Sequence, residues 1–183
     1  MLKPITGFVV VLVSLTACLS FYPIAAAGPD PIAAVCRKSK DRNLCVNSFQ
    51  SKLNGRVAPP TELAIIALRL AASNSTDTSQ FVKNMLDGGY DLDPAVDYSL
   101  NDCQQGYLDA VEQLDNSLAA LLANAYADVS AWVNAAIADV QTCQNSLNGQ
   151  PETQPGMARR NANALVLCEN ALIVIDMLAN KSL

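Results

Sequence analysis

Histidine is absent from this chain of 183 residues, and this absence excludes more chemistry than any other property of the composition. Ser-His-Asp and Cys-His catalysis need an imidazole base, and histidine-ligated zinc and haem sites need an imidazole ligand. No cysteine pair has CxxC spacing, and no glycine-rich phosphate loop is present. Carboxylate-pair hydrolysis stays compatible with the composition, but no two carboxylates stand in a recognisable frame. We therefore expect no catalytic residue, no metal site and no cofactor.

Aromatic residues are scarce at 5%, and the chain holds eight glycines. The alternation of apolar and polar residues that is typical of strands is nearly absent, whereas Ala, Leu and Asn are abundant. The sequence therefore predicts an all-α protein.

Positive charge is missing from the long stretch between Lys83 and Arg159. Lysine and arginine cluster instead near the N-terminus, at Arg37, Lys38, Lys40 and Arg42. One interpretation of the acidic stretch is a solvated face, and the other is complementarity to a basic partner, which would speed encounter and weaken with salt. Nucleic acid is disfavoured as a partner, because its phosphates would meet acids. The eleven acids of the stretch are Asp87, Asp91, Asp93, Asp97, Asp102, Asp109, Glu112, Asp115, Asp128, Asp139 and Glu152.

Residues 1–27 have the pattern of a secretory signal peptide. Lys3 supplies a positive start, residues 8–22 are apolar, and residues 25–27 are three alanines suited to cleavage. A signal anchor is the alternative, but the apolar run is short and a proline follows it. No second segment looks long and apolar enough to span a bilayer. We therefore expect a secreted protein of residues 28–183 that is not bound to a membrane after the signal is removed.

Helical periodicity divides the mature chain into two parts. Residues 28–60 hold two short helices around the loop between Cys36 and Cys45, and residues 61–183 hold four long helical patterns. Short connections between four such patterns predict an up-down-up-down four-helix bundle with an N-terminal α-helical hairpin. The first long pattern begins near Thr61, and the polar run of residues 74–79 is expected to bend or interrupt it. Its predicted core residues are Leu63, Ile66, Ala67 and Leu70.

The five mature cysteines constrain this bundle. Cys103 and Cys143 lie on core stripes of two helices and are equally far in sequence from Ala123, at the middle of their connection. Antiparallel helices joined there would bring both sulfurs to one level, although five cysteines allow many pairings. Cys168 lies on an apolar face, where a free thiol packs as a small hydrophobe, with a reactive or intermolecular thiol as the alternative. Two sequons make Asn74 and Asn180 candidate glycosylation sites.

Two motifs and the cysteine frame together resemble the plant invertase and pectin methylesterase inhibitor family. The motifs are Cys103-x-x-x-Tyr107-x-x-Ala110-Val111 and Tyr126-x-Asp128-Val129-x-x-Trp132-Val133-x-Ala135-Ala136. The resemblance covers essentially the whole mature chain, with mild departures at Asn134 and at Ile137-Ala138. It implies disulfides between Cys36 and Cys45 and between Cys103 and Cys143, an unpaired Cys168, and a four-helix bundle with a projecting helical hairpin.

The resemblance also implies an activity, which is reversible one-to-one inhibition of a plant carbohydrate-active enzyme of the apoplast or cell wall, with the vacuole as the alternative location. In pectin methylesterase inhibitors of this family, the bundle covers the substrate cleft of the enzyme. In invertase inhibitors, a Pro-Lys-Phe segment enters the sucrose site, but the equivalent residues here are Asn124-Ala125-Tyr126, without proline or lysine. A lysine beside catalytic carboxylates would make a charge-assisted contact that alanine cannot make.

We therefore expect a secreted inhibitor of pectin methylesterase, with acid invertase as the alternative target. A non-inhibitory binding module on the same scaffold is a further alternative, and the oligomeric state stays open. The candidate target-binding residues are Asn124, Ala125, Tyr126, Asp109, Glu112 and Asp128.

Overall fold

Six helices make up the computed structural model, which describes residues 30–88, 92–149 and 154–183. Within those residues there is no strand, and the all-α prediction is confirmed. The predicted signal peptide lies outside the described residues. The helices are α1 (Pro31–Cys36), α2 (Arg42–Leu53), α3 (Pro60–Asp87), α4 (Pro94–Leu122), α5 (Tyr126–Ser146) and α6 (Gln154–Ala179).

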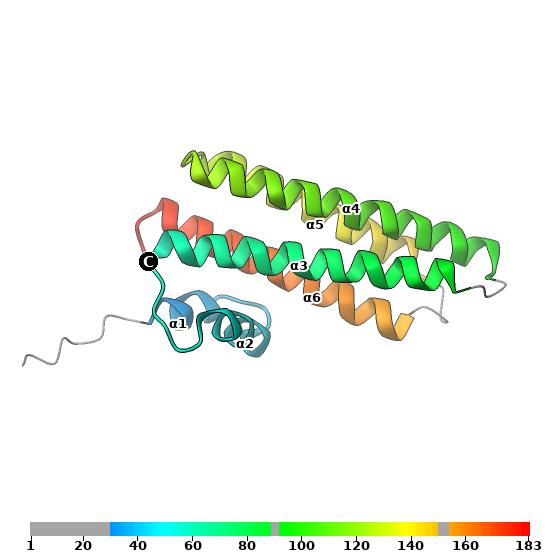
Figure 1. Ribbon diagram of the computed structural model, residues 1–183, viewed down its shortest axis with the longest axis horizontal. Helices are drawn as coiled ribbons and strands as arrows, with labels where there is room; N and C mark the ends of the chain where they lie inside the picture. Colours follow the sequence, from blue (N-terminus) through cyan, green and yellow to red (C-terminus); the bar gives the residue numbers. More distant parts are fainter. Residues whose placement is uncertain (1–29, 89–91, 150–153) are drawn as a thin grey trace, which may run out of the picture.

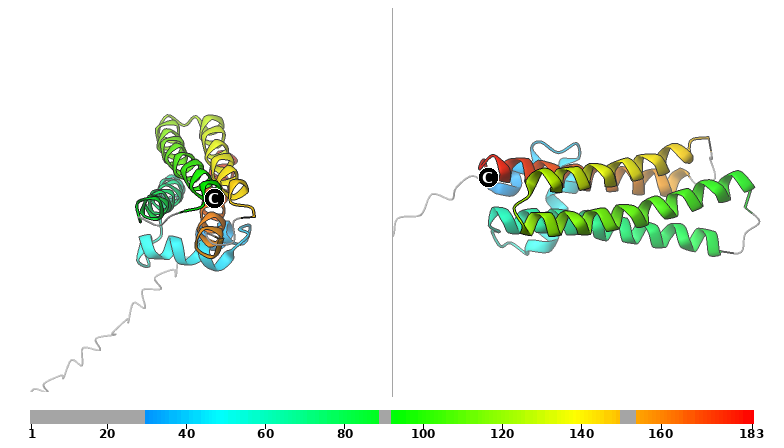
Figure 2. Two further views of the ribbon diagram at one scale, coloured as in Figure 1. Left: turned by 90° about the vertical axis from the view of Figure 1, so that its right-hand side faces the viewer. Right: turned by 90° about the horizontal axis from the view of Figure 1, so that it is seen from above.

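The four long helices α3 to α6 form the predicted up-down-up-down bundle (Figure 1). Each packs against its neighbours in chain order, and α6 closes the bundle against α3. The short helices α1 and α2 lie outside the bundle, beside α3 and α6 and away from α4 and α5, as the end-on view in Figure 2 shows. The α4–α5 pair and the α1–α2 pair are therefore on different sides of the molecule.

Local capping explains why α1 and α2 form despite their shortness. The carboxylate of Asp30 accepts a hydrogen bond from the backbone N–H of Ile32, and that of Asp41 accepts one from the N–H of Leu44. Asn54 ends α2 in the left-handed conformation, with φ of 49°. A disulfide between Cys36 and Cys45 joins the two helices, with the Cα atoms 5.5 Å apart.

Helix α3 runs continuously through its polar residues, so the predicted interruption at residues 74–79 is wrong. Two buried side chains of this run have partners nearby: the Thr78 hydroxyl donates to the carbonyl of Asn74 at 2.8 Å, and the Gln104 amide donates to the Ser79 hydroxyl at 3.0 Å. The buried hydroxyl of Ser75 has no hydrogen-bond partner among the described residues. The predicted core residues Leu63 and Ala67 are buried, whereas Ile66 and Leu70 are half-buried. The buried face of α3 is therefore rotated from the predicted one, and it also includes the fully buried residues Ala64, Leu68 and Ala71.

Helix α6 corrects another expectation. Residues Gly156–Ala179 are long and apolar enough, by length and composition alone, to cross a membrane. Their apolar side chains instead fill the bundle, where Ala164, Cys168, Ala171 and Ile175 are all buried. A helix that contacts both α3 and α5 and also receives α1 and α2 is apolar over much of its circumference, because little of it faces water.

Helices α4 and α5 pack unusually close together around Cys103 and Gly106. The disulfide between Cys103 and Cys143 brings their Cα atoms to 4.4 Å. One turn along α4, Gly106 lies so close to α5 that a Cβ atom there would stand 3.2 Å from the carbonyl oxygen of Asp139. At the next residue, the buried Tyr107 hydroxyl donates to the Asn161 side chain of α6 at 2.6 Å. The fold-level prediction of two disulfides is confirmed.

Candidate target-binding surface

The connection between α4 and α5 forms the tip of the hairpin, on the same end of the bundle as the C-terminus (Figure 1). Asn124 adopts the left-handed conformation there, with φ of 57°, and is exposed. The N–H of Ala125 donates to the carbonyl of Ala120 at 3.0 Å, which closes the turn tightly. Tyr126 begins α5; its ring packs against the core, and its hydroxyl donates to the Asn124 side chain at 3.3 Å.

The acidic candidates divide between the tip and the flank of the hairpin. Asp128 is exposed in the first turn of α5, beside the tip residues. Glu112 is exposed and Asp109 half-buried in the middle of α4. At 1.5 Å per residue, Asp109 lies about 20 Å along the helix axis from the tip. The structure therefore brings Asn124, Ala125, Tyr126 and Asp128 together, while Asp109 and Glu112 belong to a second area on the flank.

An exposed tryptophan lies on α5, one helical turn after Asp128. Trp132 is the single tryptophan of the chain, and 42% of it is exposed although its neighbour Val133 is fully buried. Asp128, Trp132 and Asp139 recur at helical spacing and share one side of α5. Trp132 was noted in the sequence as part of a family motif but not as a binding candidate. Its position next to the buried stripe, rather than on it, was the available signal.

Two further apolar side chains are exposed on α4, Leu108 at 49% and Leu122 at 72%. Exposed tryptophan and leucine side chains ringed by polar residues are typical of protein–protein contacts, where a few such anchors supply most of the binding energy. The hairpin surface of Asp109, Glu112, Leu122, Asp128 and Trp132, together with the tip Asn124–Tyr126, is called the acidic surface below.

The side chains between α4 and α5 influence each other electrostatically. Burial raises the pKa of Asp139, the nearby amide of Gln113 lowers it in part, and the negative charge of Asp109 raises it further. A raised carboxyl pKa means that the folded protein favours the protonated form of Asp139. Negative charge is therefore already crowded at Asp139, between α4 and α5 and close to Asp109 of the acidic surface.

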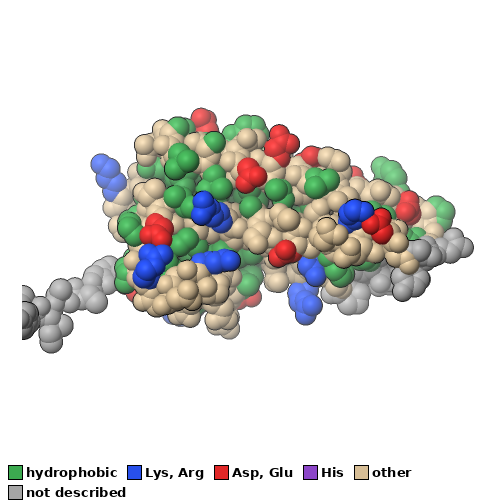
Figure 3. Space-filling view, viewed as in Figure 1, with side chains coloured by type: hydrophobic (Ala, Val, Ile, Leu, Met, Phe, Trp, Pro, Cys, Tyr) green, Lys and Arg blue, Asp and Glu red, His purple; other side chains and the backbone are tan. Residues whose placement is uncertain are grey.

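Acidic and basic side chains lie in different parts of the fold, as they do in the sequence. Neither α4 nor α5 contains a lysine or arginine, and together they carry seven acids. Figure 3 shows acidic side chains over α4 along the upper edge, with most lysines and arginines lower, over α3 and the N-terminal helices. Part of the N-terminal basic cluster is used internally, since Lys40 pairs with Glu169 of α6 at 2.5 Å.

The free thiol of Cys168 is fully buried and, among the described residues, unpaired. Burial, reinforced by the charge of Glu169, raises its pKa to about 12. A thiol with so high a pKa is a poor nucleophile, because thiolate is the reactive form. Of the two sequon asparagines, Asn74 is half-buried in the middle of α3, whereas Asn180 is exposed after α6 and donates to Asp176.

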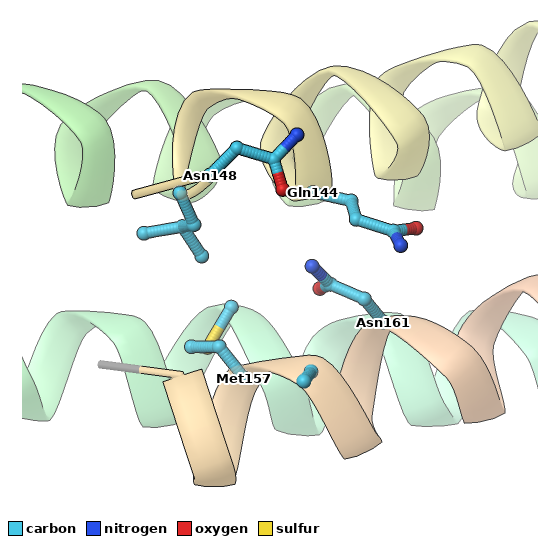
Figure 4. Close-up of a pocket in the computed structure, with 6 residues that line it drawn as sticks. Gln144, Asn148, Met157 and Asn161 are labelled. Carbon is cyan, nitrogen blue, oxygen red and sulfur yellow. The ribbon is translucent and has the colours of Figure 1, made fainter. Parts of the chain in front are cut away.

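A small pocket lies between the end of α5 and the start of α6 (Figure 4). Its volume is about 170 Å³, and its lining includes the amides of Gln144, Asn148 and Asn161. Asn161 and Met157 of α6 both point toward the end of α5 (Figure 4), and Met157 is fully buried. Small-molecule sites usually span ~300–1,000 Å³, so this pocket gives no support to a carrier function.

Fold and surface together define a class of protein: a helical bundle with two disulfides and one hairpin that carries acids but no lysine or arginine. Comparison with known proteins then gives the family. Residues 30–174 match the family model "Plant invertase/pectin methylesterase inhibitor", and the chain belongs to this family.

Similar proteins carry both names of the family. "Pectinesterase inhibitor 10" of Arabidopsis thaliana is 29% identical over 82% of this chain, although the match spans 52% of the length of that relative. "Pectinesterase inhibitor" of Actinidia deliciosa is 21% identical, with 87% of this chain and 85% of the relative covered. "Putative invertase inhibitor" of Platanus acerifolia is 23% identical, with 90% and 97% covered.

The fold also has a solved counterpart. A crystal structure of a mutant form of a pectin methylesterase inhibitor from Arabidopsis superposes with a TM-score of 0.72. The alignment covers 81% of this chain and 97% of that chain at 19% sequence identity. At this level of identity the likeness establishes the fold alone, which is the predicted four-helix bundle with its N-terminal hairpin.

Proposed function

We propose that this protein is a secreted inhibitor of pectin methylesterase that docks its acidic surface on the enzyme and blocks the substrate cleft in a one-to-one complex. The observation that carries the proposal is the coincidence, on one hairpin, of seven acids, no positive charge and an exposed tryptophan. Membership of the inhibitor family and the names of the relatives support the inhibitory role.

The rigidity of the hairpin favours binding. The Cys103–Cys143 disulfide and the close approach at Gly106 fix α4 against α5 before any partner arrives. Ordering flexible segments opposes association, so a surface ordered in advance keeps more of its contact energy as affinity. The negative charge would add long-range attraction to a basic enzyme surface and raise the association rate.

The tip supports pectin methylesterase over invertase as the target. Asn124, Ala125 and Tyr126 offer no cation to a site lined by carboxylates, and the tyrosine ring is partly committed to the core. Acid invertase is the second candidate, because relatives in Platanus carry the name of invertase inhibitors and Leu122 stands exposed beside the tip. Action in the apoplast follows from the signal-peptide pattern of residues 1–27.

The experiment is a titration of purified residues 28–183 against pectin methylesterase and acid invertase, in mildly acidic and neutral buffers. We expect stoichiometric loss of pectin methylesterase activity at one inhibitor per enzyme, with little effect on invertase. Inhibition of invertase alone would mean that acid invertase, and not pectin methylesterase, is the target. If neither enzyme lost activity at micromolar inhibitor, the inhibitory function itself would be overturned and the binding-module alternative would take its place.

A further inference from the structure

A groove lies on the other side of the molecule from the acidic surface, between the end of α2 and the first half of α3. Its volume is about 440 Å³, within the ~300–1,000 Å³ typical of ligand sites. Three of its six lining residues are cations and one is an acid. The groove is lined by Lys52, Arg56, Glu62, Ile66, Arg69 and Ser73.

Helical spacing places four of these residues on one face of α3. Glu62, Ile66, Arg69 and Ser73 recur every three or four positions and line the groove in succession. Ile66 is half-buried and gives the groove an apolar floor, which explains why this isoleucine does not lie on the bundle stripe. Arg69 and Ser73 are exposed and supply N–H and O–H donors farther along the same face.

Arg56 is held in place by Glu62. The guanidinium donates from Nη2 to Oε1 at 2.6 Å and from Nη1 to Oε2 at 3.3 Å, so the two groups pair as a fork. Other N–H donors of Arg56 stay free for a second acceptor. Among the described residues, Lys52 and Arg69 have no acidic partner within ion-pair distance, so the groove carries an excess of positive charge.

Arg56 also lines a second hollow of about 200 Å³, which extends toward α1 and meets Ile32 and the largely exposed Val57. One acid, Asp30, lies in this second part. A ligand that fits both hollows is elongated, with its negative charge placed between Lys52 and Arg69.

From this geometry we propose that the groove binds a carboxylate-bearing polysaccharide. Arginine and lysine pair with carboxylates, the Ser73 hydroxyl suits sugar hydroxyls, and Ile66 offers a surface for the C–H face of a sugar ring. The choice of polymer rests on the proposed function, because hydrolysis of pectin methyl esters leaves carboxylates along the chain. The groove lies between α2 and α3, and α2 is on the other side of the molecule from the α4–α5 pair that carries the acidic surface (Figure 2). The inhibitor can therefore hold enzyme and de-esterified polymer together.

The test is direct binding of purified residues 28–183 to polygalacturonate by calorimetry at low and high salt, without any enzyme. Fully methyl-esterified pectin is the matched neutral polymer. We expect saturable binding to polygalacturonate that weakens at least about tenfold at high salt, and no measurable binding to the esterified polymer. Equal binding to both polymers, or to neither, would overturn the assignment of a carboxylate ligand.

Charge reversal locates the binding site. Lys52→Glu with Arg69→Glu is expected to weaken polygalacturonate binding at least tenfold while inhibition of pectin methylesterase stays within twofold. Arg37→Glu with Lys38→Glu makes the same change in net charge at exposed cations outside the groove and should leave polymer binding within twofold. Thermal unfolding checks that both variants fold.

The outcomes separate this inference from the proposed function. Loss of inhibition in the Lys52/Arg69 variant, with polymer binding intact, would assign the groove to the enzyme contact and overturn the inference. Polymer binding in a protein that inhibits neither enzyme would leave the groove assignment standing and remove the proposed function.

Discussion

Two disulfide-bonded hairpins in this protein differ in almost every other respect. The α1–α2 hairpin has helices of 6 and 12 residues, carries a basic cluster and sits outside the bundle. The α4–α5 hairpin has helices of 29 and 21 residues, carries no positive charge and forms half of the bundle. The two disulfides also close loops of different length, since Cys36 and Cys45 are 9 residues apart and Cys103 and Cys143 are 40 apart. The disulfide of the long hairpin therefore restricts the unfolded chain more and should stabilise the fold more.

Removing the disulfides one at a time tests this difference on stability. Chain-entropy reasoning gives about 4 kcal/mol for the loop closed by Cys103 and Cys143, and about 2.5–3 kcal/mol for that closed by Cys36 and Cys45. We expect Cys103→Ala with Cys143→Ala to lower Tm by roughly 8–16 °C, and the other pair of alanines to lower it less. If thermal unfolding showed a larger fall in Tm after loss of Cys36 and Cys45, the disulfide of the short hairpin would be the more stabilising of the two.

Truncating the exposed tryptophan tests whether α4–α5 is the binding hairpin. Trp132→Ala should weaken inhibition of pectin methylesterase by about 30-fold, corresponding to roughly 2 kcal/mol for a central aromatic anchor. Tyr98→Ala is the control, since Tyr98 is a more exposed aromatic residue near the opposite end of α4 and should change inhibition less than twofold. Equal effects of the two variants on the inhibition constant would remove Trp132 as an anchor.

Charge reversal on α4 tests whether the negative charge of the α4–α5 hairpin attracts the enzyme. Asp109→Lys with Glu112→Lys should slow association with a basic enzyme about tenfold at low salt, and the difference should vanish at high salt. Asp77→Lys with Asp176→Lys changes the net charge equally at exposed acids on α3 and α6. If the control slowed association as much as the α4 variant in stopped-flow measurements, attraction would depend on overall charge rather than on the hairpin.

The smallest expected effect concerns pH. The folded pKa of Asp139 is raised, so the folded state binds its proton more readily than the unfolded state does. Stability is therefore lost as pH rises from the unfolded pKa through the folded pKa. Asp139→Asn should raise Tm at neutral pH by about 1–3 °C, and the gain should disappear in strongly acidic buffer. A gain that persisted unchanged at low pH would have a cause other than the carboxyl charge.

Sequence patterns predicted most of the bundle because long apolar stripes and cysteine spacing both reflect helix geometry. In α5 the apolar residues spaced four and three apart are all buried, and Cys103 and Cys143 meet as their equal distances from Ala123 indicated. Helix α3 was harder to predict: three residues of its polar run, Ser75, Thr78 and Ser79, face inward and are small enough for close helix contacts. No local pattern distinguishes that arrangement from a break in the helix.

The binding surface was only partly predictable for a different reason. Charge is readable in the sequence, so the acidity of α4 and α5 was found directly. Trp132 was missed as a contact because a residue at the edge of an apolar stripe reads as core until the neighbouring helix is placed. The groove residues Lys52 and Arg69 come from different helices, and only the docking of α2 on α3 brings them together.

The measurement that tests the central claim most directly is carboxyl footprinting of the inhibitor, alone and with pectin methylesterase at saturation. Each surface Asp and Glu is labelled with a carbodiimide and an amine, and its modification is quantified by mass spectrometry. The account predicts strong protection of Asp109, Glu112 and Asp128 in the complex, with Asp30, Asp77 and Asp176 labelled as in the free protein. Protection confined to the second group, with the acids of α4 and α5 still open to labelling, would contradict it.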